Sequence, residues 1–228
     1  MTVLEPLYDK KLECLNCQQP FTSKKVRSSF VKMKEFDTDF RPIYESDNAN
    51  PHLYHVHVCP ACGFSFSDDF SRYFPPGTKE AIQTEVTNRW VRRNYGTERT
   101  IQQAIQTYKL AIYCGTLKKE KHVLLAGMYL RTAWFYRSLK EEQQELRFLK
   151  LAVHEYEQSY SEDDFKGSQV SEVKILYLIG ELSRRIDEDG KAIKFFSMVI
   201  ERQKQTVEPK IIEMAKERWH EMRDSRKS

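Results

Sequence analysis

Two pairs of cysteines are the residues of this chain with the clearest capacity for chemistry. Cys14 and Cys17 form one Cys-x-x-Cys pair, and Cys59 and Cys62 form a second. Each pair can present two thiolates to one ion from a tight turn, and four thiolates suit the tetrahedral coordination that zinc favours. Gly63 follows the second pair directly, where such a turn commonly needs a backbone conformation open to glycine. The spacing therefore predicts a structural Zn²⁺ site.

The two pairs are far apart in the chain, and this bears on the kind of site they form. Forty-one residues separate Cys17 from Cys59, whereas compact zinc sites usually have about 15–20. The arrangement otherwise resembles a zinc ribbon. A thioredoxin-like redox pair would need a βαβ context, which the sequence does not indicate. A catalytic zinc keeps an open coordination position, and four cysteines leave none. A thiol or zinc redox sensor stays open as an alternative function.

Three histidines and a fifth cysteine lie outside these pairs. His52, His55 and His57 come just before Cys59, and an expected strand places His55 and His57 on the same face as Cys59. Either histidine could replace a ligand, although a solvated strand position is the simpler interpretation. Cys114, at the end of an expected helix, is interpreted as a small buried apolar residue.

The elements that position these residues change in character near Pro75-Pro76-Gly77, which is a strong break signal. We expect a zinc-ribbon-like metal-binding domain over residues 1–75 and a helical domain over residues 76–228. In the first domain, strands are expected over residues 25–34 and 53–58, with a polar loop over 37–50. In the second, helices are expected over residues 78–95, 98–114, 119–139, 141–160, 170–186, 191–205 and 209–223.

The expected helices form pairs that resemble the tetratricopeptide repeat. In the best match, Gly180 and Ala192 take the small-residue positions that allow two helices to pack closely. A second match, which begins at Ala126, has Glu145 where the pattern expects alanine. The predicted fold class is therefore mainly α, with tetratricopeptide-like helical hairpins and a small N-terminal β unit that resembles a zinc ribbon.

Stacked helix pairs present their first helices on a concave face. Arginines beside aromatic residues on such a face suit an acidic peptide or a C-terminal carboxylate, because arginine can pair with a carboxylate through two hydrogen bonds. Ordinary solvated arginines, and a core position for the tryptophan, are the alternatives. The candidate partner-binding residues are Arg89, Arg93, Trp134, Arg137, Tyr177, Arg184 and Arg185.

Several classes of function find little support in the sequence. There is no Gly-rich phosphate loop, no His-Glu-x-x-His and no Gly-x-Ser-x-Gly motif. The acidic pairs Asp37/Asp39 and Asp68/Asp69 could hold a cation, but both lie in expected loops. No apolar run approaches the roughly 20 residues of a membrane span, and a signal peptide is not evident. We therefore expect a cytoplasmic protein without catalytic activity.

The chain also resembles an uncharacterised bacterial family, the domain of unknown function 2225. The residues that carry the resemblance lie mostly before Phe70. They are Cys14-Leu-Asn-Cys17 with Phe21, Asp37-x-Asp39, Tyr54, and Cys59-Pro-Ala-Cys62-Gly63-Phe64. The resemblance implies a cytoplasmic bacterial protein with a metal-binding head and repeat-like helices. It implies no activity, but it draws attention to the loop that holds Asp37 and Asp39.

These observations predict a zinc-binding module or scaffold that binds a protein or an acidic peptide. Nucleic-acid binding through the zinc ribbon and basic helical faces is the second candidate. The net charge of +4 is small for a dedicated nucleic-acid domain, and residues 1–75 hold nine Lys/Arg against ten Asp/Glu. The oligomeric state is not predicted.

Overall fold

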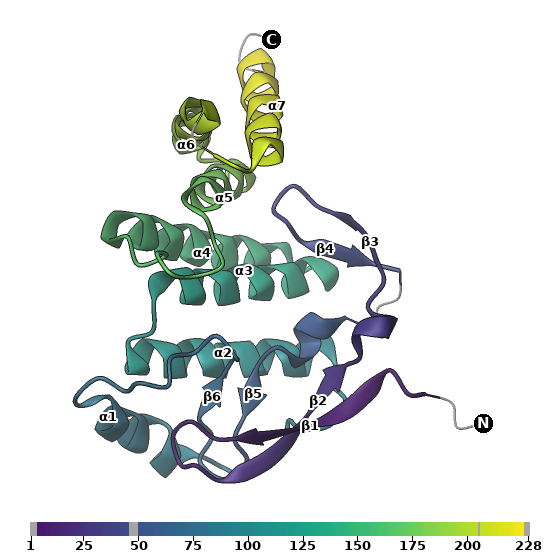
Figure 1. The fold of residues 1–228 in the computed structure, drawn as a ribbon, viewed down its shortest axis with the longest axis vertical. Helices are drawn as coiled ribbons and strands as arrows, with labels where there is room; N and C mark the ends of the chain where they lie inside the picture. The colour runs from purple at the N-terminus through teal and green to yellow at the C-terminus, as the bar shows by residue number, and fades with distance from the viewer. Residues whose placement is uncertain (1–3, 46–49, 205, 226–228) are drawn as a thin grey trace. The chain divides into compact units, whose positions relative to one another are not determined.

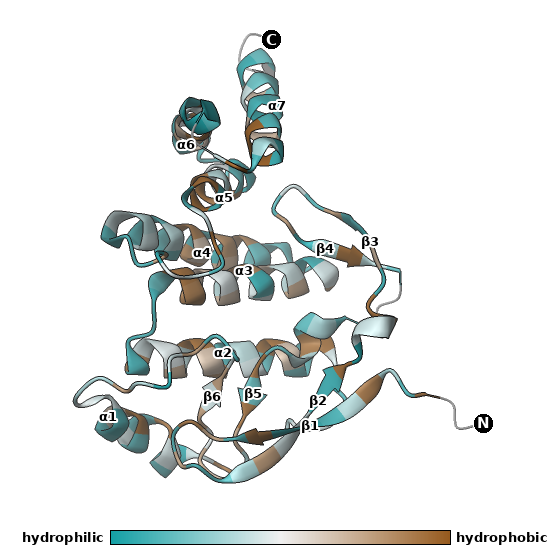
Figure 2. Ribbon diagram, viewed as in Figure 1, coloured by the Kyte–Doolittle hydropathy of each residue, from teal (hydrophilic) through white to brown (hydrophobic). Residues whose placement is uncertain are grey.

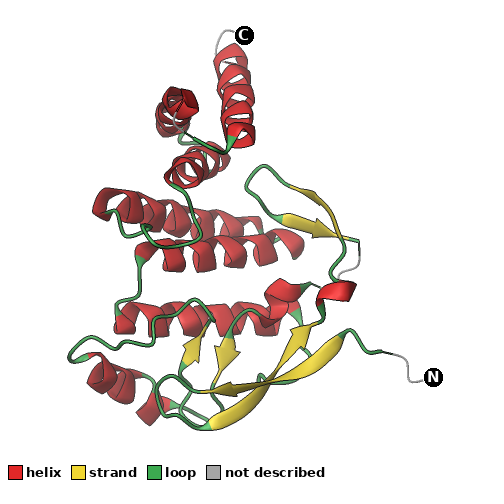
Figure 3. Ribbon diagram, viewed as in Figure 1, coloured by secondary structure: helices red, strands yellow, loops and turns green. Residues whose placement is uncertain are grey.

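The computed structural model describes residues 4–45, 50–204 and 206–225. Over these residues the chain is mainly helical, and its short antiparallel strand pairs all come before the first α-helix (Figures 1 and 3). The predicted fold class, mainly α with a small N-terminal β unit, is confirmed. The chain divides into two compact units: Met1–Glu35 with Pro42–Glu120, and Phe36–Arg41 with Lys121–Ser228.

The first unit extends beyond the change in composition at Pro75–Gly77. Helices α1 (Thr78–Glu85) and α2 (Ile101–Lys118) belong to it, and α2 packs against α1 and the strands that follow residue 56. Gly77, with a φ of 79°, precedes α1 in a left-handed conformation that favours glycine. The Pro-Pro-Gly turn thus starts a helix inside this unit, whereas the unit itself ends at Glu120.

Two antiparallel hairpins of the first unit carry the cysteine pairs in their turns. Strand β1 (Leu7–Glu13) pairs with β2 (Pro20–Val26), and Glu13 lies opposite Pro20. Strand β5 (His57–Val58) pairs with β6 (Ser65–Phe66). The chain therefore reverses direction at each Cys-x-x-Cys pair.

The expected strands in this region are partly wrong. Residues 25–34 hold the end of β2, the 3₁₀ turn η1 (Ser28–Phe30) and the start of β3 (Met33–Phe36). Residues 51–54 form a second 3₁₀ turn, η3 (Pro51–Tyr54), because the Asn50 side chain caps the amide of His52 and proline suits a first turn.

Part of the expected polar loop over residues 37–50 is a strand. Strand β4 (Pro42–Tyr44) pairs with β3 to form a third hairpin. Residues 46–49 lie outside the described residues. The segment Phe36–Arg41 at the end of this hairpin, called the tip segment below, belongs to the second compact unit.

Helix α1 ends ten residues before its expected end. A 3₁₀ turn, η4 (Thr87–Arg89), follows it, and Trp90 is extended because its indole packs on the second cysteine turn. Helix α2 begins at a capping box formed by Thr100 and Gln103. It continues through Gly115, where a stop was expected, to the buried Lys118. The Lys118 ammonium donates to the carbonyl of Tyr73 at 2.7 Å and fixes this last turn.

The second unit consists of the tip segment and helices that follow residue 121 (Figure 1). Each helix packs on the next, and α7 also contacts α5. Their bounds agree with the sequence expectation to within a few residues. The helices are α3 (His122–Ser138), α4 (Glu142–Glu162), α5 (Glu172–Arg185), α6 (Asp189–Glu201) and α7 (Pro209–Ser225); the short 3₁₀ turn η5 (Arg202–Lys204) follows α6.

The core of this unit contains the close helix approach that the sequence predicts. A Cβ atom on Gly180 of α5 would lie 2.9 Å from the Phe196 ring of α6, and Ala192 is fully buried. Figure 2 shows hydrophobic residues along α5, whereas hydrophilic residues dominate α7. The tetratricopeptide register itself stays a prediction. None of the described helices is both long and apolar enough to cross a membrane.

Candidate functional site

The two cysteine turns have the same backbone geometry. In the first, the amide of Gln18 donates to the carbonyl of Cys14 at 2.9 Å; in the second, the amide of Gly63 donates to the carbonyl of Cys59 at 2.9 Å. Gln18 and Gly63 both have positive φ values, 60° and 73°. Each turn thus directs its pair of sulfurs to the same side, as a shared metal ion requires.

The four predicted ligands lie together in the structure. The Sγ atoms of Cys14, Cys17, Cys59 and Cys62 are all within 4.8 Å of one another. The distances from Cys14 to Cys62 and from Cys17 to Cys59 are both 3.6 Å. Tetrahedral Zn–S bonds of about 2.3 Å separate their sulfurs by about 3.8 Å, so this donor set fits such an ion.

The thiols of the cluster interact with one another and with one neighbouring amide. The side-chain amide of Asn16 donates to the Cys62 sulfur at 3.8 Å. Hydrogen bonds from the thiols of Cys14 and Cys62 hold the pKa of Cys59 well below its usual range, and the same hydrogen bonds, together with burial, raise the pKa values of Cys14 and Cys62. Cys14, Cys59 and Cys62 are buried and Cys17 is half-buried. The cluster can hold a metal ion, and its four sulfurs would fill all the positions of a tetrahedral coordination shell.

The buried side chain of Arg99 supports the approach to the second turn. Its guanidinium donates to the carbonyls of Leu53 and Val56 at 3.1 and 2.7 Å, and to the hydroxyl of Ser23 at 3.2 Å. Its Nε donates to the carbonyl of Tyr95. Burial lowers the pKa of Arg99 to about 10. Arg99 therefore joins the β2 strand to the segment that leads into Cys59.

The histidines considered as alternative ligands are bound elsewhere. The Nε2 atom of His57 lies 3.2 Å from Asp68, and that of His55 lies 3.7 Å from Asp69. Burial lowers the pKa of His57 to about 4. The strand expected over residues 53–58, which placed both histidines on the face of Cys59, is wrong in its first part because η3 replaces it. The acidic pair Asp68/Asp69 is thus partnered by histidines and Lys10.

Cys114 is buried, as expected, and lies outside the cluster. Its sulfur accepts a hydrogen bond from the amide of Ser65 at 3.3 Å. Burial raises the pKa of its thiol to about 12. It is therefore a neutral thiol that supports β6 rather than a further ligand.

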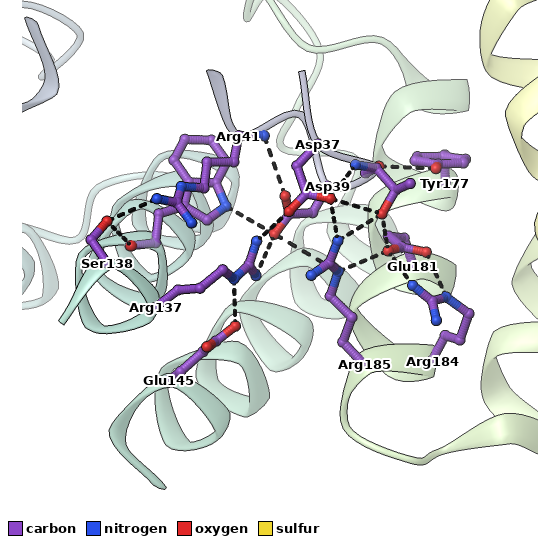
Figure 4. Close-up of polar contacts among 12 residues, drawn as sticks. Asp37, Asp39, Arg41, Arg137, Ser138, Glu145, Tyr177, Glu181, Arg184 and Arg185 are labelled. Carbon is purple, nitrogen blue, oxygen red and sulfur yellow. Dashed lines mark hydrogen bonds and ion pairs between the residues drawn. The ribbon is translucent and has the colours of Figure 1, made fainter. Parts of the chain in front are cut away.

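The second candidate site lies within the helical unit, where α3 and α5 hold the tip segment (Figure 4). We call Trp134, Arg137, Tyr177 and Arg185 the arginine groove. Arg137 binds both acidic residues of the tip, with Nη1 2.8 Å from Asp37 and Nη2 2.7 Å from Asp39. Arg185 Nη2 lies 2.7 Å from the other oxygen of Asp37.

Asp39 is fully buried, so its charge depends on partners. One of its carboxylate oxygens accepts from Arg137 and from the indole of Trp134, the latter at 3.0 Å. Its other oxygen accepts from the amide of Arg41 at 3.3 Å. The hydrogen bonds that Asp39 needs are therefore divided between α3 and the tip segment itself.

The residues between and after the two aspartates also contact α5. The hydroxyl of Tyr177 donates to the carbonyl of Thr38 at 2.9 Å, and the Thr38 hydroxyl donates to Glu181 at 2.5 Å. The ring of Phe40 packs against Tyr177, with 5.3 Å between the centroids. The ammonium of Lys174 lies 4.8 Å above the Phe40 ring. The groove thus binds backbone, carboxylates and an aromatic ring together.

Electrostatics favour charged carboxylates in this site. Burial opposes ionisation of Asp37, but Arg185, the Thr38 amide and Arg137 outweigh it and hold its pKa below the usual value. Burial opposes ionisation of Glu181 as well, and hydrogen bonds from Arg184 and Thr38 reverse the effect, so its pKa is also lowered. Burial opposes the charge of Arg137, but its hydrogen bonds to Asp39 and Glu145 outweigh this effect and raise its pKa.

The family of this chain is now clear. A family model described as "Uncharacterized protein conserved in bacteria (DUF2225)" matches residues 7–222. The chain belongs to this family. The match spans both cysteine turns, the tip segment and the helices as far as α7, so the resemblance seen in the sequence is confirmed. Searches of curated proteins and of solved structures give no match.

Five of the seven candidate partner-binding residues of this DUF2225 protein lie together. Trp134, Arg137, Tyr177 and Arg185 form the arginine groove, and Arg184 pairs with Glu181 beside it at 2.8 Å. The sequence did not identify the chain segment that fills this groove. The Asp37-x-Asp39 pattern was the available signal, but a hydrogen bond that spans 148 residues leaves no local trace.

Arg89 and Arg93 belong to the first unit and are not on the first helix of a helical pair. Arg89 lies on η4, is exposed, and pairs with Glu85 at 3.1 Å. Arg93 follows in a non-helical segment, where it lines a surface hollow with Arg92, Phe21 and Pro60. The helix expected to carry both residues is wrong beyond Glu85, because Trp90 turns toward the metal centre.

Proposed function

We propose that this DUF2225 protein is a zinc-stabilised interaction module that binds an acidic segment of a partner protein. In this proposal, Cys14, Cys17, Cys59 and Cys62 hold one Zn²⁺ ion, which links two hairpins and performs no reaction. A closed thiolate set supports a structural role, since catalytic zinc needs an open position. Free thiols also suit a reducing compartment such as the cytoplasm.

The observation that carries the binding function is the tip segment in the arginine groove. Arg137, Arg185 and Trp134 bind two aspartates of a short chain segment, with contacts to its backbone and to one aromatic ring. Paired arginine and carboxylate groups of this kind are common where a helical protein recognises an acidic peptide. Helices that pack consecutively, as in a tetratricopeptide-like repeat, supply the rigid support that such recognition needs.

The metal part of the proposal is tested by metal analysis of the purified full chain. We expect one zinc per chain, lost in Cys59→Ser and retained in Cys114→Ser, because Cys59 belongs to the four-cysteine cluster and Cys114 does not. Zinc loss should destabilise the first unit, since the ion joins its two cysteine hairpins and contributes folding free energy. Metal-free wild-type protein with normal thermal stability would contradict this part.

The binding part is tested by affinity capture with matched variants. Arg137→Lys/Arg185→Lys keeps both charges but removes the forked hydrogen bonds, so protein partners should be lost. Arg89→Lys makes the same change at an exposed arginine that pairs with Glu85 at 3.1 Å, and it should capture the same proteins as wild type. Equal capture by all three proteins would contradict a role for the groove.

Nucleic-acid binding stays the second candidate because of one surface feature. Arg92 and Arg93 border a hollow beside Pro60 of the second cysteine turn, together with the aromatic Phe21. A basic hollow with an aromatic residue can bind a phosphate and stack a base. If this function holds, affinity for single-stranded probes falls steeply with salt and is lost in Arg92→Ala/Arg93→Ala.

A further inference from the structure

The hairpin that carries the tip segment has little apolar support of its own. All four residues of β3 are exposed, and Phe36 at its end is 57% exposed. On β4, Ile43 is 38% exposed. Most contacts of the tip segment are therefore polar and come from the arginine groove, so its departure exposes little apolar surface apart from the buried Tyr177 ring against which Phe40 packs.

The groove can keep its own charges paired if the tip segment leaves. The Nε atom of Arg137 lies 2.6 Å from Glu145, and that of Arg185 lies 2.8 Å from Glu181. Removal of one partner from a buried ion pair is costly when the other charge is left alone. Here each arginine retains a carboxylate on its own or the neighbouring helix. Glu145 is the residue that stands where the repeat pattern expects alanine, and this pairing accounts for it.

We propose that Asp37–Phe40 is a displaceable internal occupant of the arginine groove, and that the natural partner carries a segment of the same chemistry, Asp-x-Asp-aromatic. This inference rests on the proposed interaction function and specifies its partner and its control. When the partner segment binds, the tip segment leaves, and the two compete for the same donors.

The contacts of the tip segment define what the partner must provide. Two carboxylates two residues apart are needed because Arg137 uses one Nη atom for each of Asp37 and Asp39. The residue between them contacts Tyr177 through its backbone carbonyl, and Glu181 and Arg185 through its hydroxyl, so a threonine or serine fits best there. An aromatic residue must follow, because the Phe40 position packs on Tyr177 with Lys174 above it.

Covalent attachment gives the tip segment an advantage over a free peptide. A segment on a short tether has an effective concentration of about 1 mM, so it lowers the apparent affinity of any competitor. Weakening the tip alone should therefore increase partner affinity, whereas weakening the groove should abolish it. A segment with a purely structural role would not give opposite effects for these two changes.

The test uses the full chain and a synthetic peptide with the sequence of residues 34–42, blocked at both ends. Asp37→Asn/Asp39→Asn is the variant with a weakened tip, and it should bind the peptide about tenfold or more tightly than wild type. Asp163→Asn makes the same change at an exposed carboxylate of the same unit and should match wild type. A peptide with asparagine in place of both aspartates should bind none of them.

A second measurement covers the outcome that the tip variant does not fold. The chain has three tryptophans, and the indole N–H of Trp134 donates to Asp39. In a ¹H–¹⁵N spectrum of wild-type protein, the indole signal of Trp134 is the one that is missing from the spectrum of Trp134→Phe. Peptide addition should shift the Trp134 signal and leave those of Trp90 and Trp219 in place.

The possible results separate this inference from the proposed function. An unchanged Trp134 signal at millimolar peptide, with no gain of affinity in the tip variant, would overturn the displacement proposal. If Arg137→Lys/Arg185→Lys still loses protein partners in that case, the interaction function stands without it. Sedimentation that shows wild-type dimers, dispersed by the tip substitutions, would also overturn it, because the occupant would then be a second copy.

Discussion

The indole ring of Trp90 occupies the space that a Cβ atom on Gly63 would need. A Cβ built there would lie 2.5 Å from two atoms of the ring, and the indole N–H donates to the carbonyl of Pro60 at 3.0 Å. Trp90 thus covers the second cysteine turn and binds its backbone. The same contact ends the helical segment at Arg89. One tertiary interaction therefore sets this helix boundary and also covers one side of the cysteine cluster.

We expect Gly63→Ala to destabilise the first unit more than Gly77→Ala. Both glycines have positive φ values, 73° and 79°, but among the described residues, apart from its two chain neighbours, no atom lies within 4 Å of a Cβ added at Gly77. Gly77→Ala therefore measures the backbone cost, about 1 kcal/mol. Gly63→Ala adds a clash with Trp90, about 1–3 kcal/mol more. Thermal unfolding of both zinc-loaded variants measures the difference, and equal losses would contradict the steric role of Trp90.

The metal centre could be predicted from sequence because its signal is local and chemical. Cys14, Cys17, Cys59 and Cys62 have side chains that suit one kind of ion, and each pair fixes its own turn. The amphipathic helices after residue 121 were predictable for a similar reason, since periodicity is repeated over several turns. The strand β1 was not predicted, because polar residues occupy both of its faces and its partner is set by the cysteine turn.

The arginine groove could be predicted only in part. The positions of its residues follow from the expected helical pairs, which place Trp134 and Arg137 on the first helix of one pair and Tyr177 and Arg185 on the first helix of the next. Their occupant does not follow, since Asp37 is 100 residues from Arg137 and 148 from Arg185. Acidic residues in one segment and arginines in another are compatible with many ion pairs, and only the three-dimensional structure shows which pairs form.

We expect Arg99→Lys to weaken the metal centre although Arg99 is not a ligand. The guanidinium donates to three carbonyls and one hydroxyl, which a single ammonium cannot reach together. Unsatisfied buried carbonyls should cost about 2 kcal/mol or more. A chelator competition should show faster zinc loss from Arg99→Lys than from Arg92→Lys, an exposed arginine of the same unit. Equal rates would show that Arg99 does not position the second turn.

The tip segment should lose its contribution to stability in acid. The folded-state pKa values of Asp37 and Glu181 are lowered, so their contribution is fully present above the unfolded values, 3.8 and 4.5. It is lost as the pH falls through the lower folded-state values. The charged groups that face these carboxylates are Arg137, Arg184 and Arg185.

Because acid also releases metal from thiolates, the measured quantity is a difference between proteins. Unfolding free energies of wild type and Asp37→Asn should differ at neutral pH and converge as the pH falls below about 4. Asp163→Asn should remain parallel to wild type over this range, because the Asp163 pair with Lys166 is exposed. A constant difference between wild type and Asp37→Asn at every pH would contradict the claim that ion pairs of Asp37 stabilise the bound tip segment.

Metal removal should loosen the tip segment, because the chain between the cysteine pairs contains it. Residues Phe36–Arg41 lie within the 41 residues that separate Cys17 from Cys59. An ion bound to both pairs closes this loop and shortens the flexible chain that tethers the tip segment. Without the ion, the tip is tethered by a longer flexible chain, and its effective concentration falls. Apo wild type should therefore bind the acidic peptide more tightly than the zinc form.

The Trp134 indole signal measures this coupling directly. Chelation of wild-type protein should move the signal toward its position in Asp37→Asn/Asp39→Asn, and added zinc should restore it, since Trp134 donates to Asp39 only while the tip is bound. The same treatment of the double variant should leave its signal unchanged, because its tip is already released. If complete zinc removal leaves the wild-type signal in place, the arginine groove holds the tip independently of the metal centre.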